Sequence, residues 1–109
     1  MLIVRADLEK LRNIPREERF ADWPDMLEWV RSIAEAGNHL GGAPLEIEGR
    51  YVSKTGVLSD GPFIESKESV IGYDIILAKN IDDAVSVAKR CPMVLAGLAV
   101  REVRPMLEL

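Results

Sequence analysis

The chain has 109 residues, enough for one domain but too short for two domains with separate hydrophobic cores. Hydrophobic residues make up 48% and charged residues 29%, a balance that excludes disordered, collagen-like and mucin-like proteins. The formal net charge of −4 repels phosphate backbones, so nucleic acid is not an expected partner. We therefore expect a single folded domain over residues 1–109.

The sequence also has no pattern typical of a membrane span, an internal disulfide or a structural metal site. No apolar run reaches the roughly 18 residues needed to cross a bilayer, and residues 1–4 lack the features of a secretory signal. The single cysteine, Cys91, cannot form an internal disulfide, and with one histidine it cannot supply a structural zinc site. We expect a cytoplasmic protein without membrane contact and without a metal, nucleotide or other cofactor.

The first third of the chain predicts a strand, a connection and a helix. Residues 1–6 form a short apolar run typical of a buried strand, and residues 8–19 mix both charge signs, as a surface connection does. A helix is expected from an Asp22 cap to Gly37, with Trp29 at the flank of its apolar stripe, either at the core edge or facing a cleft or second subunit. The stripe itself consists of Trp23, Met26, Leu27, Val30, Ile33 and Ala34.

Strand patterns dominate the rest of the chain. Alternation between residues 40 and 58 predicts a hairpin that turns at Gly49, after a bend at Gly41 and Gly42. Residues 70–78 are nearly continuous in apolar side chains, as in a central strand covered on both faces. Asn80 then caps a second helix that ends before Pro92, and a last strand spans residues 98–104.

This order of elements predicts a ferredoxin-like α+β sandwich with an antiparallel sheet, two helices on one face and an extra β-hairpin. The opposite face of the sheet then has no helix over it. If that face is apolar, a partner must cover it, and a symmetric homodimer is the simplest cover.

Residues 60–68 form the most specific stretch, Asp-Gly-Pro-Phe-Ile-Glu-Ser-Lys-Glu, and Gly72 and Tyr73 follow it. The stretch resembles the motif of the YCII-related family in its DGPF subgroup, and the likeness extends over nearly the whole chain. The resemblance implies a protomer of the dimeric α+β barrel type, in which two sheets pack face to face and leave clefts beside the interface.

For function, the resemblance implies either an enzyme or an interaction module. Related branches include isomerases and dehydrochlorinases that act on small ring compounds, and similar domains occur fused to extracytoplasmic-function sigma factors. A better-studied branch of the family has a His–Asp pair, with the histidine in the first helix and the aspartate before a proline. Here the first helix has no histidine and Cys91 precedes Pro92, so that pair does not transfer. Ile71 and Arg101 also depart from the subgroup, and Arg101 adds a charge at a strand position that is normally apolar.

The motif stretch supplies most of the candidate site residues. Asp60 serves either as an acid/base for a bound molecule or as a turn residue whose carboxylate binds backbone N–H groups. Phe63 either anchors the loop in the core or stacks on a ligand ring. Glu65, Lys67 and Glu68 either bind an anionic molecule or form surface ion pairs.

Two residues outside that stretch complete the candidate set. Tyr73 either donates its hydroxyl into a cleft or packs in the core or an interface. His39, the only histidine, either acts as a second acid/base or meets the free carbonyls at the end of the first helix.

The leading hypothesis is a cytoplasmic homodimer that binds a small anionic or polar-ring molecule. In its enzymatic form, Asp60 acts as acid/base for an isomerase-like or lyase-like step that needs no cofactor. The alternative hypothesis is a non-catalytic regulatory or interaction module that docks to a partner protein.

Overall fold

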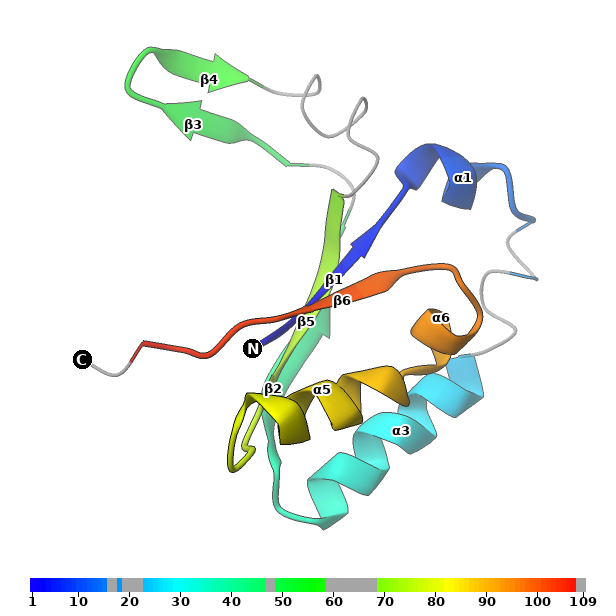
Figure 1. The fold of residues 1–109 in the computed structure, drawn as a ribbon. Helices are drawn as coiled ribbons and strands as arrows, with labels where there is room; N and C mark the ends of the chain where they lie inside the picture. Colours follow the sequence, from blue (N-terminus) through cyan, green and yellow to red (C-terminus); the bar gives the residue numbers. More distant parts are fainter. Residues whose placement is uncertain (16–17, 19–22, 47–48, 59–68, 108–109) are drawn as a thin grey trace.

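The structure is a computed structural model that describes residues 1–15, 18, 23–46, 49–58 and 69–107. Its main sheet is antiparallel and has the strand order β2-β5-β1-β6. The strands are β1 (Leu2–Ala6), β2 (His39–Pro44), β5 (Ser69–Ile76) and β6 (Val100–Val103). Helices α3 (Trp23–Glu35) and α5 (Ile81–Lys89) cover the same face of this sheet (Figure 1). The predicted ferredoxin-like α+β fold is confirmed.

The sheet buries one face because its side chains alternate. In β1, Leu2, Val4 and Ala6 are buried against the helices, whereas Ile3 and Arg5 lie on the other face. β1 pairs with both β5 and β6, so it lies in the middle of the sheet. The prediction of a buried first strand is confirmed, but among the described elements helices cover β5 on only one of the two faces predicted to be covered.

Two hydrophobic clusters fill the space between the sheet and the helices. The larger cluster joins the start of β1 to both helices and contains Leu2, Trp29, Ile33, Ala88 and Cys91. The smaller cluster lies at the other end of β1 and contains Val4, Ala6 and Ala99. Cys91 is fully buried within the first cluster.

Helix α3 packs Met26, Val30 and Ile33 of the predicted stripe against the core, but the buried stripe is shifted toward Trp29. Trp29 is 7% exposed and belongs to the core, whereas Leu27, a predicted stripe residue, is 57% exposed. The reason is that Trp29 makes specific contacts under the sheet, which rotate the buried stripe toward it. Asp22, the predicted cap, lies outside the described residues.

Helix α5 begins as predicted. The Asn80 side chain accepts a hydrogen bond of 2.8 Å from the backbone N–H of Asp83, which caps the helix. The sequence analysis missed α6 (Pro92–Leu95), a single turn that Pro92 opens, and placed only a strand after it.

A hairpin is present, but the predicted pairing was wrong, because residues 51–58, predicted as one strand, form both of its strands. The described hairpin pairs β3 (Tyr51–Ser53) with β4 (Gly56–Leu58) and turns at Lys54 and Thr55, not at Gly49. Gly41 and Gly42 form part of strand β2 and not a bend. A short helix, α1 (Leu8–Arg12), fits the predicted surface connection with one helical turn. No helix in the described ranges is long and apolar enough to span a membrane.

Candidate functional site

A buried carboxylate, Asp74, interrupts the apolar sequence of β5. Its side chain lies on the helix-covered face, because Asp74 is paired with the buried Leu2 across the β1–β5 ladder. Only 12% of the side chain is exposed. An ionised carboxylate in such a place needs charged or hydrogen-bonding partners, because burial removes its hydration.

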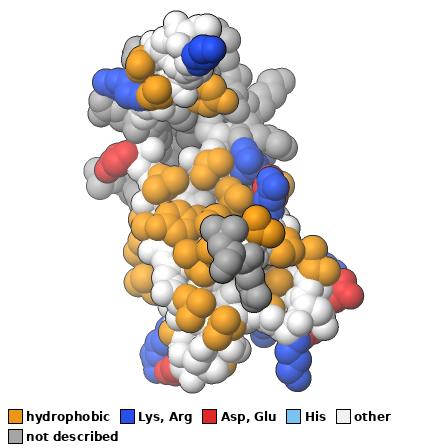
Figure 2. Space-filling view, turned by 90° about the vertical axis from the view of Figure 1, so that its left-hand side faces the viewer, with side chains coloured by type: hydrophobic (Ala, Val, Ile, Leu, Met, Phe, Trp, Pro, Cys, Tyr) orange, Lys and Arg blue, Asp and Glu red, His pale blue; other side chains and the backbone are white. Residues whose placement is uncertain are grey.

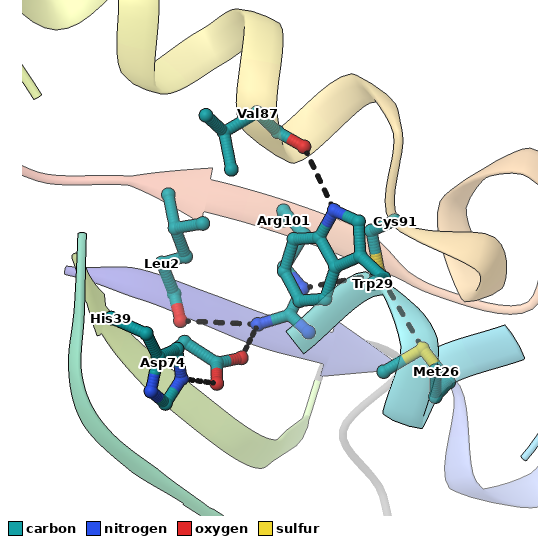
Figure 3. Close-up of polar contacts among 8 residues, drawn as sticks. All are labelled: Leu2, Met26, Trp29, His39, Asp74, Val87, Cys91 and Arg101. Atoms are coloured by element: carbon teal, nitrogen blue, oxygen red, sulfur yellow. Dashed lines mark hydrogen bonds and ion pairs between the residues drawn. The ribbon is translucent and has the colours of Figure 1, made fainter. Parts of the chain in front are cut away.

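The first partner is Arg101 on β6. Its Nη1 atom lies 2.7 Å from Oδ2 of Asp74, and only 2% of its side chain is exposed. The same Nη1 lies 3.4 Å from the carbonyl oxygen of Leu2, and Nε lies 3.4 Å from Sγ of Cys91. Arg101 therefore fixes one oxygen of the carboxylate from within the core (Figure 3).

The ring of Trp29 covers the guanidinium of Arg101 from the helix side. The guanidinium carbon of Arg101 lies 4.9 Å from the centre of the Trp29 ring, within the range of a cation–π interaction. The indole N–H donates to the backbone oxygen of Val87 on α5 at 3.2 Å, which fixes the ring between the two helices. Trp29 thus holds Arg101 in place, and its indole N–H bonds Val87 and not Asp74.

The second partner of Asp74 is His39, the first residue of β2. The Nε2 atom of His39 lies 2.8 Å from Oδ1 of Asp74, and 14% of the histidine side chain is exposed. A carboxylate accepts, so Nε2 carries the proton and Nδ1 of a neutral ring is left as an acceptor. In the described part of the chain, Nδ1 has no hydrogen-bond partner.

Gly42 allows β2 to approach Asp74 this closely. A Cβ atom at this position would lie 2.5 Å from the backbone oxygen of Tyr73 and 2.7 Å from Oδ1 of Asp74. Both distances are shorter than any van der Waals contact, so a side chain here would push the strand away from the carboxylate. The predicted close backbone approach is therefore real at Gly42, while a Cβ at Gly41 would meet nothing within 4 Å.

The structure brings only one predicted site residue into this cluster, His39. The predicted alternative, contact with the α3 carbonyls, is not what its ring does, because the backbone N–H groups of Gly37 and Asn38 occupy the carbonyls of Ala34 and Ile33. Tyr73 follows the opposite face of β5 and pairs with Ile3 and Ala43. Asp60, Phe63, Glu65, Lys67 and Glu68 lie outside the described residues.

The sequence analysis missed Asp74, although a signal was present. A single acidic residue in an otherwise apolar central strand requires a buried partner. Arg101, singled out as an unusual charge in the last strand, is that partner. The available evidence was two opposite charges in two predicted strands, residues 70–78 and 98–104.

Metal binding has no support in the described residues, since no group of three or more His, Cys, Asp or Glu side chains gathers there. What the cluster can do is hold an imidazole in one orientation, with its proton on Nε2 and an acceptor at Nδ1. This is the arrangement by which a carboxylate orients a histidine for proton transfer.

The model of the YCII-related domain matches residues 1–107. The chain belongs to the YCII-related family. No curated protein matches the sequence. In this YCII-related chain the described His–Asp pair joins β2 to β5, so it differs from the helix-borne pair that the sequence analysis found untransferable.

Proposed function

We propose that this YCII-related protein binds a small polar or anionic molecule beside His39 and exchanges a proton with it through Nδ1. The observation that carries the proposal is the 2.8 Å contact between Nε2 of His39 and Oδ1 of Asp74, together with an Nδ1 atom that has no partner in the described chain. The pair is mostly buried, so the carboxylate acts on the ring with little competition from water.

In the proposed step, Nδ1 removes a proton from one atom of the bound molecule while Nε2 keeps its own proton and its hydrogen bond to Asp74. The carboxylate then stabilises the imidazolium, and the same proton returns to a second atom or leaves with a departing group. An isomerisation or an elimination of this kind balances without an oxidant, reductant or co-reactant. Arg101 keeps Asp74 in place but does not exchange the proton, because its guanidinium stays charged.

The DGPF motif contributes to the same proposal. Residues 60–68 precede β5 directly, and β5 carries Asp74. In this proposal Asp60 acts as the partner acid, while Lys67 supplies the positive charge for an anionic molecule; Phe63, Glu65 and Glu68 shape the loop around it. Tyr73 has no part in this proposed site, since its side chain lies on the face of β5 opposite Asp74.

Nuclear magnetic resonance of the imidazole tests the proposal directly, because His39 is the only histidine. Long-range ¹H–¹⁵N spectra should show a proton on Nε2 and none on Nδ1 in the free protein. Benzoate and pyruvate, as small anionic probes, should shift the Nδ1 signal at millimolar concentration in the parent chain.

Two variants sharpen this experiment. Asp74→Asn should lose the fixed tautomer and the response to the probes, whereas Glu35→Gln, which alters an exposed ion pair on α3, should keep both. A ring protonated on Nδ1 in the free protein, or an Nδ1 signal that neither probe moves, would remove the proposed site.

The same proposal includes a homodimer formed through the open face of the sheet. Antiparallel sheets normally present polar side chains to water on such a face. Here Ile3, Tyr73 and Ile75 lie on it, with Val70 and Val100 at 39% and 51% exposure. Figure 2 views this side of the molecule, and hydrophobic side chains form a broad band across its centre. Burial of such a band against a second copy is favourable by the hydrophobic effect.

A non-catalytic interaction module is the second candidate, and one observation favours it. Both carboxylate oxygens of Asp74 and the guanidinium of Arg101 already have partners inside the protein, as in a purely structural network. In that case Asp74→Asn would reduce stability alone, the probes would leave His39 unchanged, and the apolar face would carry the function.

A further inference from the structure

The β3–β4 hairpin exposes apolar side chains on a projecting element. Val52 is 73% exposed, Val57 62% and Tyr51 57%. The hairpin extends from one end of the main sheet, beyond the layer of helices (Figure 1). Within the described elements, β3 and β4 pack against each other and against no other element to a comparable extent.

A hairpin of this size does not stabilise itself. Its ladder consists of three residue pairs, from Tyr51–Leu58 to Ser53–Gly56. Two-stranded hairpins in water are marginal at best and need a third strand or a packed face. The exposed valines are therefore the side chains that a packing partner would cover.

The solvent-accessible surface of the whole molecule is larger than that of a typical compact monomer of the same mass. A compact monomer of 12.1 kDa has an accessible surface of about 6,000 Å², whereas this protein has 7984 Å². The Cα radius of gyration is 15.1 Å, compared with about 13 Å for a compact domain of 109 residues. This excess of about 2,000 Å² lies within the range of area that one subunit of a large obligate dimer buries.

The distribution of charge along the chain favours a second copy of the chain as the partner of the hairpin. Residues 49–58 carry Arg50 and Lys54 and no acidic residue, which is a charge of +2. The net charge of the chain is −4, so the remainder of each copy carries −6. A basic, apolar arm is thus complementary to the body of a second copy.

We propose that the β3–β4 hairpin is a docking arm, which packs the side chains of Val52 and Val57 on a second copy of this chain. The arm rests on the proposed dimer and extends it, because it adds an exchanged element to the contact between the two open sheet faces. Each copy gives one arm and receives one, as twofold symmetry requires.

Photo-cross-linking of the full chain tests the arm. A benzoylphenylalanine at position 52 should give, on irradiation, a covalent product of twice the chain mass. The same group at position 95 is the control, because Leu95 on α6 is also 73% exposed. It should give no product of doubled mass. Cross-links from position 52 that stay within one chain would overturn the arm.

A charge variant gives an independent measurement. Val52→Lys combined with Val57→Lys should raise the dimer dissociation constant at least tenfold in sedimentation equilibrium, while Leu95→Lys should leave it unchanged. A dimer that is unaffected by the double variant and gives no intermolecular cross-link removes the arm but keeps the open-face dimer. A chain that is monomeric at micromolar concentration removes both, and the spectrum of His39 tests the site separately.

Discussion

Asp74 is the residue whose environment differs most from what its position in the sequence predicts. It is a charge in an apolar strand, and its partner Arg101 is more deeply buried than Asp74 itself. Buried ion pairs contribute little net stability, yet the loss of one member is costly because the other charge remains without hydration.

The pair can be measured by a double-mutant cycle. Asp74→Ala and Arg101→Met should each lower the free energy of unfolding by about 3–5 kcal/mol. Asp74→Ala combined with Arg101→Met should lower it by less than the sum of the two single changes, because no charge is left uncompensated. Urea denaturation of the four proteins gives the coupling, and strictly additive losses would contradict a buried pair.

Gly42 permits a second residue-scale prediction with a neighbour as its control. Gly42→Ala should lower the free energy of unfolding by about 1–3 kcal/mol, because its Cβ would collide with backbone at Tyr73. Gly41→Ala, which meets nothing within 4 Å, should change it little. If the His39 spectrum were unchanged in Gly42→Ala, close approach of β2 would not be what positions the imidazole.

At this scale the sequence predicted the cluster only in part. His39 and the unusual charge of Arg101 were recognised, because each stands out by residue type. Asp74 was missed because strand prediction weighs the run of apolar residues and not the single polar one. The order of the strands is a property of the fold, so spacing alone could not show that Asp74 and Arg101 lie on either side of β1 and reach each other across it.

Among the elements, α5 shows how far local chemistry determines structure. Its start depends on Asn80, whose side chain satisfies a backbone N–H that the helix leaves without a partner. Asn80→Ala should therefore lower the free energy of unfolding by about 1 kcal/mol in thermal or urea denaturation. Ser86→Ala, within the same helix, should change it by a few tenths at most, since that hydroxyl bonds the Asp82 carbonyl already used by the helix. Equal losses in both variants would argue against the cap.

The hairpin shows where local chemistry is ambiguous. Two glycines could serve the turn, and the sequence analysis chose Gly49, whereas Gly56 with φ of 152° is the one beside the turn. Alternation shows that strands exist but not which segments pair, and residues 51–58, predicted as one strand, form both strands of the hairpin. The α3 stripe was predicted except for its shift toward Trp29, because the contacts of Trp29 with Arg101 and Val87 come from distant parts of the chain.

For the whole molecule, the strand order follows from the sequence of elements, and the homodimer is a proposal that its open sheet face allows us to test. The open sheet face gives a direct prediction. Ile3→Lys should raise the dissociation constant of the proposed dimer at least tenfold, because it adds a third charged side chain beside Arg5 and Glu102 on the face that the dimer would bury. Within one chain the new lysine lies opposite Glu102, so the monomer should keep its unfolding transition.

Leu27→Lys is the control for that experiment. Leu27 is 57% exposed on α3, on the side of the sheet away from the open face. Sedimentation equilibrium should find its dimer as tight as the parent. Loss of the dimer in both variants would mean that net charge, and not the sheet face, governs association.

The stacking of Trp29 on Arg101 also allows the cluster to be followed by tryptophan fluorescence. Indole fluorescence depends on nearby charge and on the hydrogen bond of its N–H, and Trp29 has a guanidinium 4.9 Å from its ring centre and a bond to Val87. The other tryptophan, Trp23, is 43% exposed, so replacing it with phenylalanine leaves one buried indole as the emitter. A change that displaces Asp74 should also displace Arg101 and therefore shift the wavelength of the Trp29 emission maximum. Intrinsic fluorescence thus reports on the cluster without an added dye.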